Sequence, residues 1–165
     1  MVAKNIEQKA RQIKLIVSDI DGVWTDGKMY YSAEGETMKA FSTYDGMACW
    51  LLSHAKIPVA IITGEDSQIV ATRARKLKIE DVHLGIVDKL AVLQGLMDKY
   101  DLNAEEVAYI GDDINDFECM QAVSLSACPA NSPVVHILEP DILLERKGGD
   151  GAFREFADII LSTRE

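Results

Sequence analysis

The sequence predicts an α/β fold in which a Rossmann-like parallel sheet carries helices on both faces, giving three layers. Short aliphatic runs alternate with segments of helical periodicity along the chain. The runs are apolar almost throughout, which is typical of parallel strands covered on both faces. A length of 165 residues suits one domain, and we expect residues 1–165 to form it.

The expected elements follow in chain order. Polar, helix-prone residues come first, over 1–12. Strands are expected over residues 13–17, 58–62, 82–84, 107–110, 124–127 and 142–144. Helices are expected over residues 45–55, 66–77, 87–100, 115–122 and 153–161. Met47, Trp50, Leu51 and Leu52 are expected in the core, and Trp24 either packs on the hairpin described next or lines a pocket.

Residues 28–41 interrupt the alternation, because β-prone ends surround the turn signal at 33–36. We expect a β-hairpin there, within a flap of about residues 24–43 that follows the first strand. A glycine-rich stretch near residue 148 predicts a flexible hinge. This hinge would lie at the start of a C-terminal tail of about residues 147–165.

Composition excludes several classes of function. A net charge of −10 does not suit a nucleic-acid surface, which needs clustered Lys and Arg. No apolar stretch approaches the ~20 residues that a membrane span needs, and the first residues do not resemble a secretory signal. The three cysteines are widely spaced, as buried thiols are in a reducing compartment. A cytoplasmic protein without nucleic-acid or membrane partners is therefore expected.

Polar residues follow several of the predicted strands at the point where each strand ends. Because the carboxyl ends of parallel strands meet at one edge of a sheet, these residues should share one cavity. They are Asp19, Asp21, Thr63, Gly64, Asp112, Asp113 and Asp116, with Lys89 at the start of a helix nearby. Crowded carboxylates repel one another unless a cation joins them.

The cation predicted by these residues is Mg²⁺, because the available ligands are all oxygens and Mg²⁺ suits a site that must also hold phosphate. Asp19 and Asp112 are the expected side-chain ligands, with the backbone carbonyl of Asp21 as a third. Asp19 could attack a phosphoryl group and form an aspartyl-phosphate. Asp21 would act as general acid and base, while Thr63, Gly64 and Lys89 hold the transferring oxygens.

The motifs that carry these residues resemble those of the haloacid dehalogenase superfamily of phosphatases. They are DxDGVxTDG at 19–27, TGE at 63–65, DK at 88–89 and GDDxND at 111–116. The resemblance implies a haloacid-dehalogenase-like fold and an Mg²⁺-dependent phosphohydrolase with the roles given above. It also implies that Asp113 and Asp116 support the metal site and the lysine.

Only 44 positions separate Asp19 from Thr63, and 26 separate Thr63 from Lys89, so the cap domains of larger members have no room. The chain resembles the capless branch that acts on phosphorylated 3-deoxy-ulosonic sugar acids, a class of small molecule. That resemblance implies a homotetramer in which the hairpin and tail of neighbouring subunits close each site. Arg154, in the tail, would then contact substrate, although a plain surface role is the alternative.

The length of the sugar is open. Octulosonate 8-phosphate phosphatases usually show TGR where Glu65 stands, whereas nonulosonate 9-phosphate phosphatases resemble this chain in Glu65 and in Lys76. The nine-carbon substrate is favoured weakly, with Glu65 and Lys76 as substrate-binding residues. Lys76 on a solvated helix face is the alternative.

Two other functions fit parts of the pattern. Receiver domains also combine acids, Thr and Lys at the carboxyl end of a parallel sheet, but they place the acceptor aspartate on a later strand. A regulatory domain of the same fold would have no use for a second buried carboxylate at Asp21. Both alternatives rank below the phosphatase.

Overall fold

A computed structural model describes residues 2–164, and its centre is a six-stranded sheet. The strand order is β5-β4-β1-β6-β7-β8, and every neighbouring pair is parallel. The strands are β1 (Leu15–Ser18), β4 (Val59–Ile62), β5 (Asp81–His83), β6 (Val107–Ile110), β7 (Leu125–Cys128) and β8 (Ile142–Leu143). The predicted parallel sheet is confirmed.

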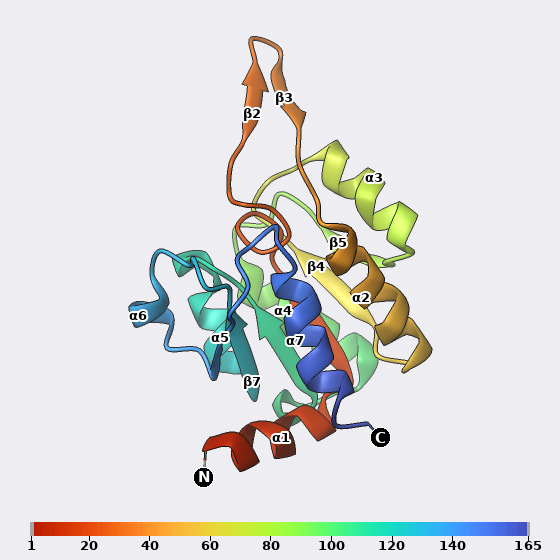
Figure 1. Cartoon of the computed structure of the whole chain (residues 1–165). Coiled ribbons are helices and arrows are strands. Elements are labelled where there is room, and N and C mark those ends of the chain that lie inside the picture. Colours follow the sequence, from red (N-terminus) through yellow and green to blue (C-terminus); the bar gives the residue numbers. More distant parts are fainter. Residues whose placement is uncertain (1, 165) are drawn as a thin grey trace.

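Helices cover both faces of the sheet (Figure 1). One layer holds α1 (Val2–Gln12), α2 (Thr43–His54), α3 (Gln68–Leu77) and α7 (Ala152–Leu161). The other holds α4 (Lys89–Tyr100), α5 (Phe117–Ala122) and the short α6 (Val135–Leu138), which was not predicted. Two 3₁₀ turns, Ala104–Glu106 and Ile114–Asp116, precede β6 and α5.

Side chains of β1 show why the sheet needs both layers. Ile16 belongs to the apolar core beneath α2 and α7, whereas Leu15 and Val17 belong to the core beneath α4. Successive residues of a strand point to opposite faces, so a strand whose four residues are all buried must be covered on both faces. The aliphatic run in the sequence therefore corresponds to a central strand.

The predicted hairpin consists of β2 (Tyr30–Ser32) and β3 (Gly35–Met38), paired antiparallel. It rises from the carboxyl edge of the main sheet and stands clear of both helical layers (Figure 1). Its apolar side chains lie at the surface, with Tyr31 62% and Met38 56% exposed. Between β1 and β4 the described chain holds only this hairpin and α2, so no cap domain is present there.

Two expectations about aromatic and apolar residues were wrong. Met47 and Trp50 are about half exposed on the outer side of α2, while Leu52 alone of the four is fully buried. Trp24 is not part of the pocket lining and lies fully buried in the core. Its ring stacks on Phe153 of α7 at 4.5 Å between centroids, and its indole N–H donates to the Ser18 hydroxyl at 2.8 Å.

The glycine-rich segment before α7 is packed, contrary to the expected flexible hinge. The Gly149 N–H donates to the Val23 carbonyl at 3.0 Å, and the Gly148 N–H donates to Asn131 at 2.9 Å. A Cβ on Gly148 would lie 1.8 Å from the Gly22 carbonyl oxygen. Glycine is needed at 148 because two backbones approach too closely for a side chain.

None of the helices in residues 2–164 is long and apolar enough to span a membrane.

Candidate active site

An open pocket of about 330 Å³ lies at the carboxyl ends of β1, β4 and β6. This is where a doubly wound sheet places ligands, because the helices that follow the adjacent strands β1 and β6 lie on opposite faces of the sheet. Seven predicted site residues line the pocket: Asp19, Asp21, Thr63, Gly64, Glu65, Asp112 and Asp113. Lys89 and Asp116 lie behind this lining and are buried.

Asp19 follows β1 directly and is 5% exposed. Its Oδ1 accepts a hydrogen bond from the Ile20 N–H at 2.7 Å, and its Oδ2 lies 3.1 Å from the Lys89 ammonium. Burial and the negative charge of Asp116 raise the pKa of Asp19 well above its ordinary value, although Lys89 opposes the rise. The carboxylate is therefore fixed in place and short of positive charge.

Lys89 is the first residue of α4, which begins there because the Asp88 side chain accepts the Ala91 N–H at 3.0 Å. The Lys89 ammonium donates to Asp116 Oδ1 at 2.8 Å and pairs with Asp19. Burial lowers the pKa of Lys89, but the charges of Asp19 and Asp116 outweigh it and raise the pKa above its ordinary value. The lysine is a permanent cation beneath the pocket.

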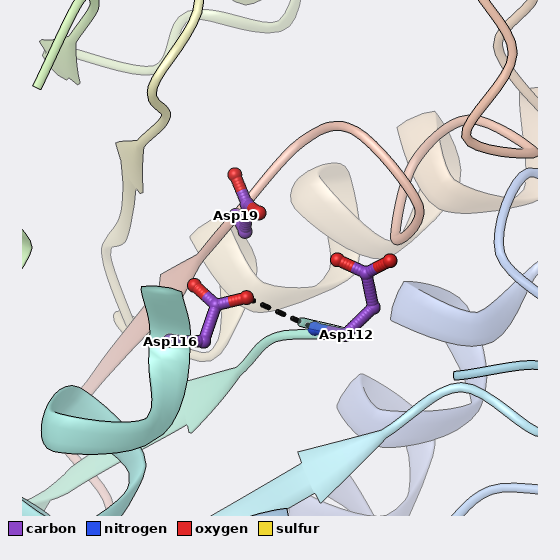
Figure 2. Close-up of side chains that lie close together, drawn as sticks. All are labelled: Asp19, Asp112 and Asp116. Atoms are coloured by element: carbon purple, nitrogen blue, oxygen red, sulfur yellow. Dashed lines mark hydrogen bonds between the residues drawn. The ribbon is translucent and has the colours of Figure 1, made fainter. Parts of the chain in front are cut away.

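Asp112 follows β6, and its carboxylate reaches the loop that follows β1 (Figure 2). Gly22 makes this approach possible, since a Cβ there would lie 1.8 Å from Asp112 Oδ2, and its φ of +85° suits glycine. Burial, followed by the charges of Asp116 and Asp113, raises the pKa of Asp112 to about 7. Two acids, Asp19 and Asp112, thus carry charge that the protein alone does not neutralise.

Asp116 is fully buried and acts as a support for its neighbours. Its Oδ1 accepts from Lys89 and from the Tyr109 hydroxyl at 2.7 Å. Its Oδ2 accepts the Asp112 N–H at 3.0 Å, the contact drawn in Figure 2. Because both oxygens have partners, Asp116 fixes the lysine and the loop rather than offering a free ligand atom.

The carboxylates fit a divalent cation. Oxygens of Asp19, Asp112 and Asp116 lie within 4.8 Å of one another, and the donor set contains no sulfur or nitrogen. Hard oxygen ligands select Mg²⁺ or a similar ion. Asp19 and Asp112 would hold the ion, and binding it would relieve the repulsion that raises their pKa values.

Asp21 lines the same pocket and forms an ion pair with Lys39, a residue that was not predicted to belong to the site. Its Oδ1 lies 2.6 Å from the ammonium of Lys39, which comes immediately after β3. Asp21 Oδ2 is buried and has no hydrogen-bond partner within residues 2–164. One oxygen of Asp21 is therefore tied to the hairpin and the other is left for a ligand or a proton.

Two predicted substrate-binding residues lie outside the pocket of their own chain. Lys76 lines a larger hollow, about 630 Å³, near the amino ends of β4 and β5, at the other edge of the sheet. Arg154 is on α7, where its guanidinium pairs with Asp158 at 2.8 Å. The acidic pocket, although smaller, contains the clustered reactive groups, and we assign the chemistry to it.

Other supporting residues were not predicted. Ser132 donates to the Asp112 carbonyl at 2.6 Å, and the buried Thr25 hydroxyl accepts the N–H groups of Gly22 and Gly27 at 3.2 Å each. Tyr109 could have been noticed, because a single hydroxyl stands in the aliphatic strand VAYI. Lys39 gave no signal, since its contact with Asp21 depends on how the hairpin folds back.

The fold and the acidic pocket agree with what comparison with known proteins shows. Residues 3–128 match the family model described as haloacid dehalogenase-like hydrolase, and the chain belongs to that family. The 3-deoxy-D-manno-octulosonate 8-phosphate phosphatase KdsC of Haemophilus influenzae is 38% identical over 159 residues, covering 96% of this chain and 88% of the relative.

Solved structures agree with this relationship. The octulosonate 8-phosphate phosphatase of Moraxella catarrhalis, in complex with a magnesium ion, a phosphate ion and 3-deoxy-D-manno-octulosonate (KDO), superposes with a TM-score of 0.92. It is 37% identical and covers 97% of this chain and 92% of its own. The cobalt-bound form of the H. influenzae enzyme gives a TM-score of 0.91 at 39% identity, with 95% and 92% covered.

Proposed function

We propose that this chain is a Mg²⁺-dependent phosphatase of a phosphorylated 3-deoxy-2-ulosonic sugar acid. The observation that carries the proposal is the pocket lined by Asp19 and Asp112, whose carboxylate oxygens lie within 4.8 Å of one another, with the buried Lys89 3.1 Å from Asp19. Relatives that align over nearly the whole chain are named as octulosonate 8-phosphate phosphatases, and one of them holds Mg²⁺, phosphate and KDO together.

Asp19 is the nucleophile. Its carboxylate oxygen attacks phosphorus, the bond from phosphorus to the sugar oxygen breaks, and an aspartyl-phosphate forms. Asp21 donates a proton to the departing sugar oxygen and then removes a proton from the water that attacks the aspartyl-phosphate. Cleavage of the acyl phosphate releases inorganic phosphate and restores Asp19.

Thr63, Gly64 and Lys89 stabilise the charge on the transferring oxygens. Thr63 and Gly64 follow β4 and line the pocket, and Lys89 lies 3.1 Å from Asp19. Such donors are effective because they are already oriented when the charge develops. Asp19, Asp112 and the Asp21 backbone carbonyl would hold Mg²⁺, which would supply charge neutralisation and Lewis-acid polarisation of the phosphoryl group.

The eight-carbon acid is the substrate named for the relatives, and Glu65 is the feature that favours the nine-carbon acid. Glu65 lines the pocket and can accept hydrogen bonds from sugar hydroxyls. Lys76 and Arg154 lie away from the pocket of the same subunit, so they contact substrate only if a neighbouring subunit brings them there.

Assembly as a homotetramer is part of the proposal. The apolar side chains of the hairpin are exposed in the single chain, which suits contact with other copies. An open pocket also needs a cover, because water-filled sites weaken the electrostatic interactions used in catalysis. We place the enzyme in the cytoplasm, consistent with three buried cysteines that form no disulfide.

The proposal is tested by phosphate release from octulosonate 8-phosphate, nonulosonate 9-phosphate and p-nitrophenyl phosphate, with Mg²⁺ or with EDTA. We expect many turnovers with Mg²⁺ on at least one sugar phosphate, and none in Asp19→Asn. Asp26→Asn is the matched control, because Asp26 is an exposed aspartate of the same loop outside the pocket lining. Including Glu65→Arg shows whether Glu65 sets the preferred sugar length.

Stoichiometric phosphorylation without turnover would contradict the enzyme and support a receiver-like acceptor. Activity that survives Asp19→Asn would remove the proposed nucleophile.

A further inference from the structure

Lys39 has an environment that is unusual for a lysine near an open pocket. Its side chain has no exposed surface, although the hairpin that carries it stands away from the sheet. The ammonium lies 2.6 Å from Asp21 Oδ1 and 2.7 Å from Glu36 Oε1. A lysine is rarely buried unless its charge is paired, and here two carboxylates pair with it.

A hydrogen bond from Ser67 connects these ion pairs to a third segment of the chain, the loop after β4. Glu36 of β3 accepts a hydrogen bond on its Oε2 from the Ser67 hydroxyl at 2.5 Å. Ser67 is itself buried and lies between the TGE motif and α3. Asp21, Lys39, Glu36 and Ser67 therefore form one chain of contacts, which joins the loop after β1, the hairpin and the loop after β4.

Lys39 does not reach substrate, because its ammonium is enclosed by the two acids and its side chain has no accessible surface. Its effect on the pocket passes through Asp21. Lys39 takes Asp21 Oδ1 and leaves Oδ2 as the one oxygen of that carboxylate without a partner in the described chain. A carboxylate held in this way has a defined direction in which it can deliver a proton.

We propose that Lys39 is a positioning residue for the acid and base Asp21, and that Glu36 and Ser67 hold it in place. Movement of the hairpin then moves the proton donor, so that proton transfer is linked to the element that would cover the substrate. The inference rests on the proposed role of Asp21 in phosphate transfer.

A purely structural role for these ion pairs is the competing explanation. Removing one partner of a buried ion pair destabilises a protein whatever the pair does in catalysis. General loss of folded protein lowers activity on all substrates alike. Misplacement of a proton donor lowers activity only on substrates whose leaving group needs the proton.

Leaving-group dependence separates the two explanations. A sugar alkoxide leaves poorly without protonation, whereas p-nitrophenolate leaves readily without it. kcat/KM reports the steps up to departure of the leaving group, so the later role of Asp21 as a base does not enter it. The measurement is kcat/KM for the preferred sugar phosphate and for p-nitrophenyl phosphate, with Mg²⁺, in Lys39→Met, Glu36→Gln and Ser67→Ala.

For Lys39→Met we expect kcat/KM to fall by about 10²-fold on the sugar phosphate, the lower end of what general acid catalysis contributes, with little change on the aryl phosphate. Glu36→Gln and Ser67→Ala should show smaller losses with the same difference between substrates. Lys28→Met is the matched control, since Lys28 lies two residues before β2 with its side chain 74% exposed, and it should change neither value.

Equal losses on both substrates in all three variants would overturn the positioning role. If Asp21→Asn shows the difference between substrates and the three variants do not, the role of Asp21 stands and that of Lys39 falls. If Asp21→Asn shows no such difference, the proposed acid catalysis fails and the inference fails with it. Should Lys39→Met not fold, as thermal unfolding would reveal, Glu36→Gln and Ser67→Ala decide the question.

Discussion

At the scale of a single residue, Asp112 shows that burial and neighbouring acids make ionised carboxylates unfavourable in this pocket. Its pKa of about 7 results from burial and from the neighbouring acids Asp116 and Asp113. A carboxylate with such a pKa is partly protonated near neutral pH, and a cation that keeps it ionised gains binding energy from the relief of repulsion. The carboxylates of the site therefore repel one another in the protein alone, and a metal ion would neutralise their charge.

We expect Mg²⁺ to raise the melting temperature of the wild-type protein, because the ion binds the folded state and not the unfolded chain. In Asp112→Asn the shift with Mg²⁺ should disappear. The variant without metal should be more stable than the wild type at pH 8, by on the order of 2 kcal/mol, since a disfavoured charge is gone. Differential scanning calorimetry in EDTA and in Mg²⁺ measures both effects.

Asp26→Asn, in an exposed position of the neighbouring loop, should keep the full Mg²⁺ shift. A shift of the same size in Asp112→Asn would show that this carboxylate does not hold the ion.

Element packing decides how α7 is attached. Asp45, near the start of α2, accepts the Arg154 N–H in the first turn of α7 at 2.9 Å. Phe153 stacks on Trp24, and Gly148 touches the backbone of the loop that carries Gly22. The tail is therefore joined to the loop that faces Asp112, so a disturbance of α7 should reach the pocket.

Burial raises the pKa of Asp45 from 3.8 to about 6. Between these two pH values the folded protein keeps a proton that the unfolded chain loses, so this group makes stability fall as pH rises through the window and leaves it constant above. Asp45→Asn keeps an acceptor for the Arg154 N–H and removes the charge. We expect the variant to lose about 2 kcal/mol of this pH dependence, measured by urea unfolding between pH 4 and 7.

Asp158→Asn is the control, because Asp158 is an exposed acid of α7, the helix whose Arg154 N–H Asp45 accepts. Parallel stability profiles for the wild type and Asp45→Asn would refute the assignment of this pH dependence to Asp45.

Gly148→Ala should destabilise the protein by about 2 kcal/mol or more, because the new Cβ would lie 1.8 Å from the Gly22 carbonyl and the backbones must separate. Gly95→Ala is the matched control. Gly95 lies inside α4 with no atom within 4 Å of an added Cβ, and the change should stabilise by roughly 0.5–1 kcal/mol. Equal urea midpoints for the two variants would contradict the close approach at 148.

At the scale of the whole molecule, the hairpin is the part whose apolar side chains the single chain leaves exposed. Met29, Tyr30, Tyr31 and Met38 are all at least 42% exposed, and the pocket below them is open. Apolar side chains grouped on a projecting element are typical of an interface. The proposed tetramer would bury them and bring further residues toward the pocket.

Tyr31→Glu should therefore shift the protein from a tetramer to smaller species in sedimentation velocity, because a charge would be buried at the interface. Ile137→Glu is the control, since Ile137 is a half-exposed residue of α6, away from the hairpin. A wild-type protein that sediments as a fully active monomer would contradict the proposal that neighbouring subunits cover each pocket.

Much of the fold was predictable, because the aliphatic runs of β1, β4 and β6 carry their own evidence of burial on two faces. The pocket residues at the ends of these strands were predictable for the same reason. Trp24, Trp50 and the segment around Gly148 were not, because apolar or glycine-rich composition does not say which neighbour a residue meets.

The sequence by itself determined the parallel sheet and the set of acids at its carboxyl edge, because strand periodicity and strand ends are local properties of the chain. Only the tertiary structure decided that Lys39 pairs with Asp21 and that both carboxylate oxygens of Asp116 accept hydrogen bonds from within the protein. It also decided that Lys76 lines a different hollow from the acidic pocket. Those outcomes depend on how the hairpin and helices pack in three dimensions, and contacts between distant segments leave no periodic trace in the sequence.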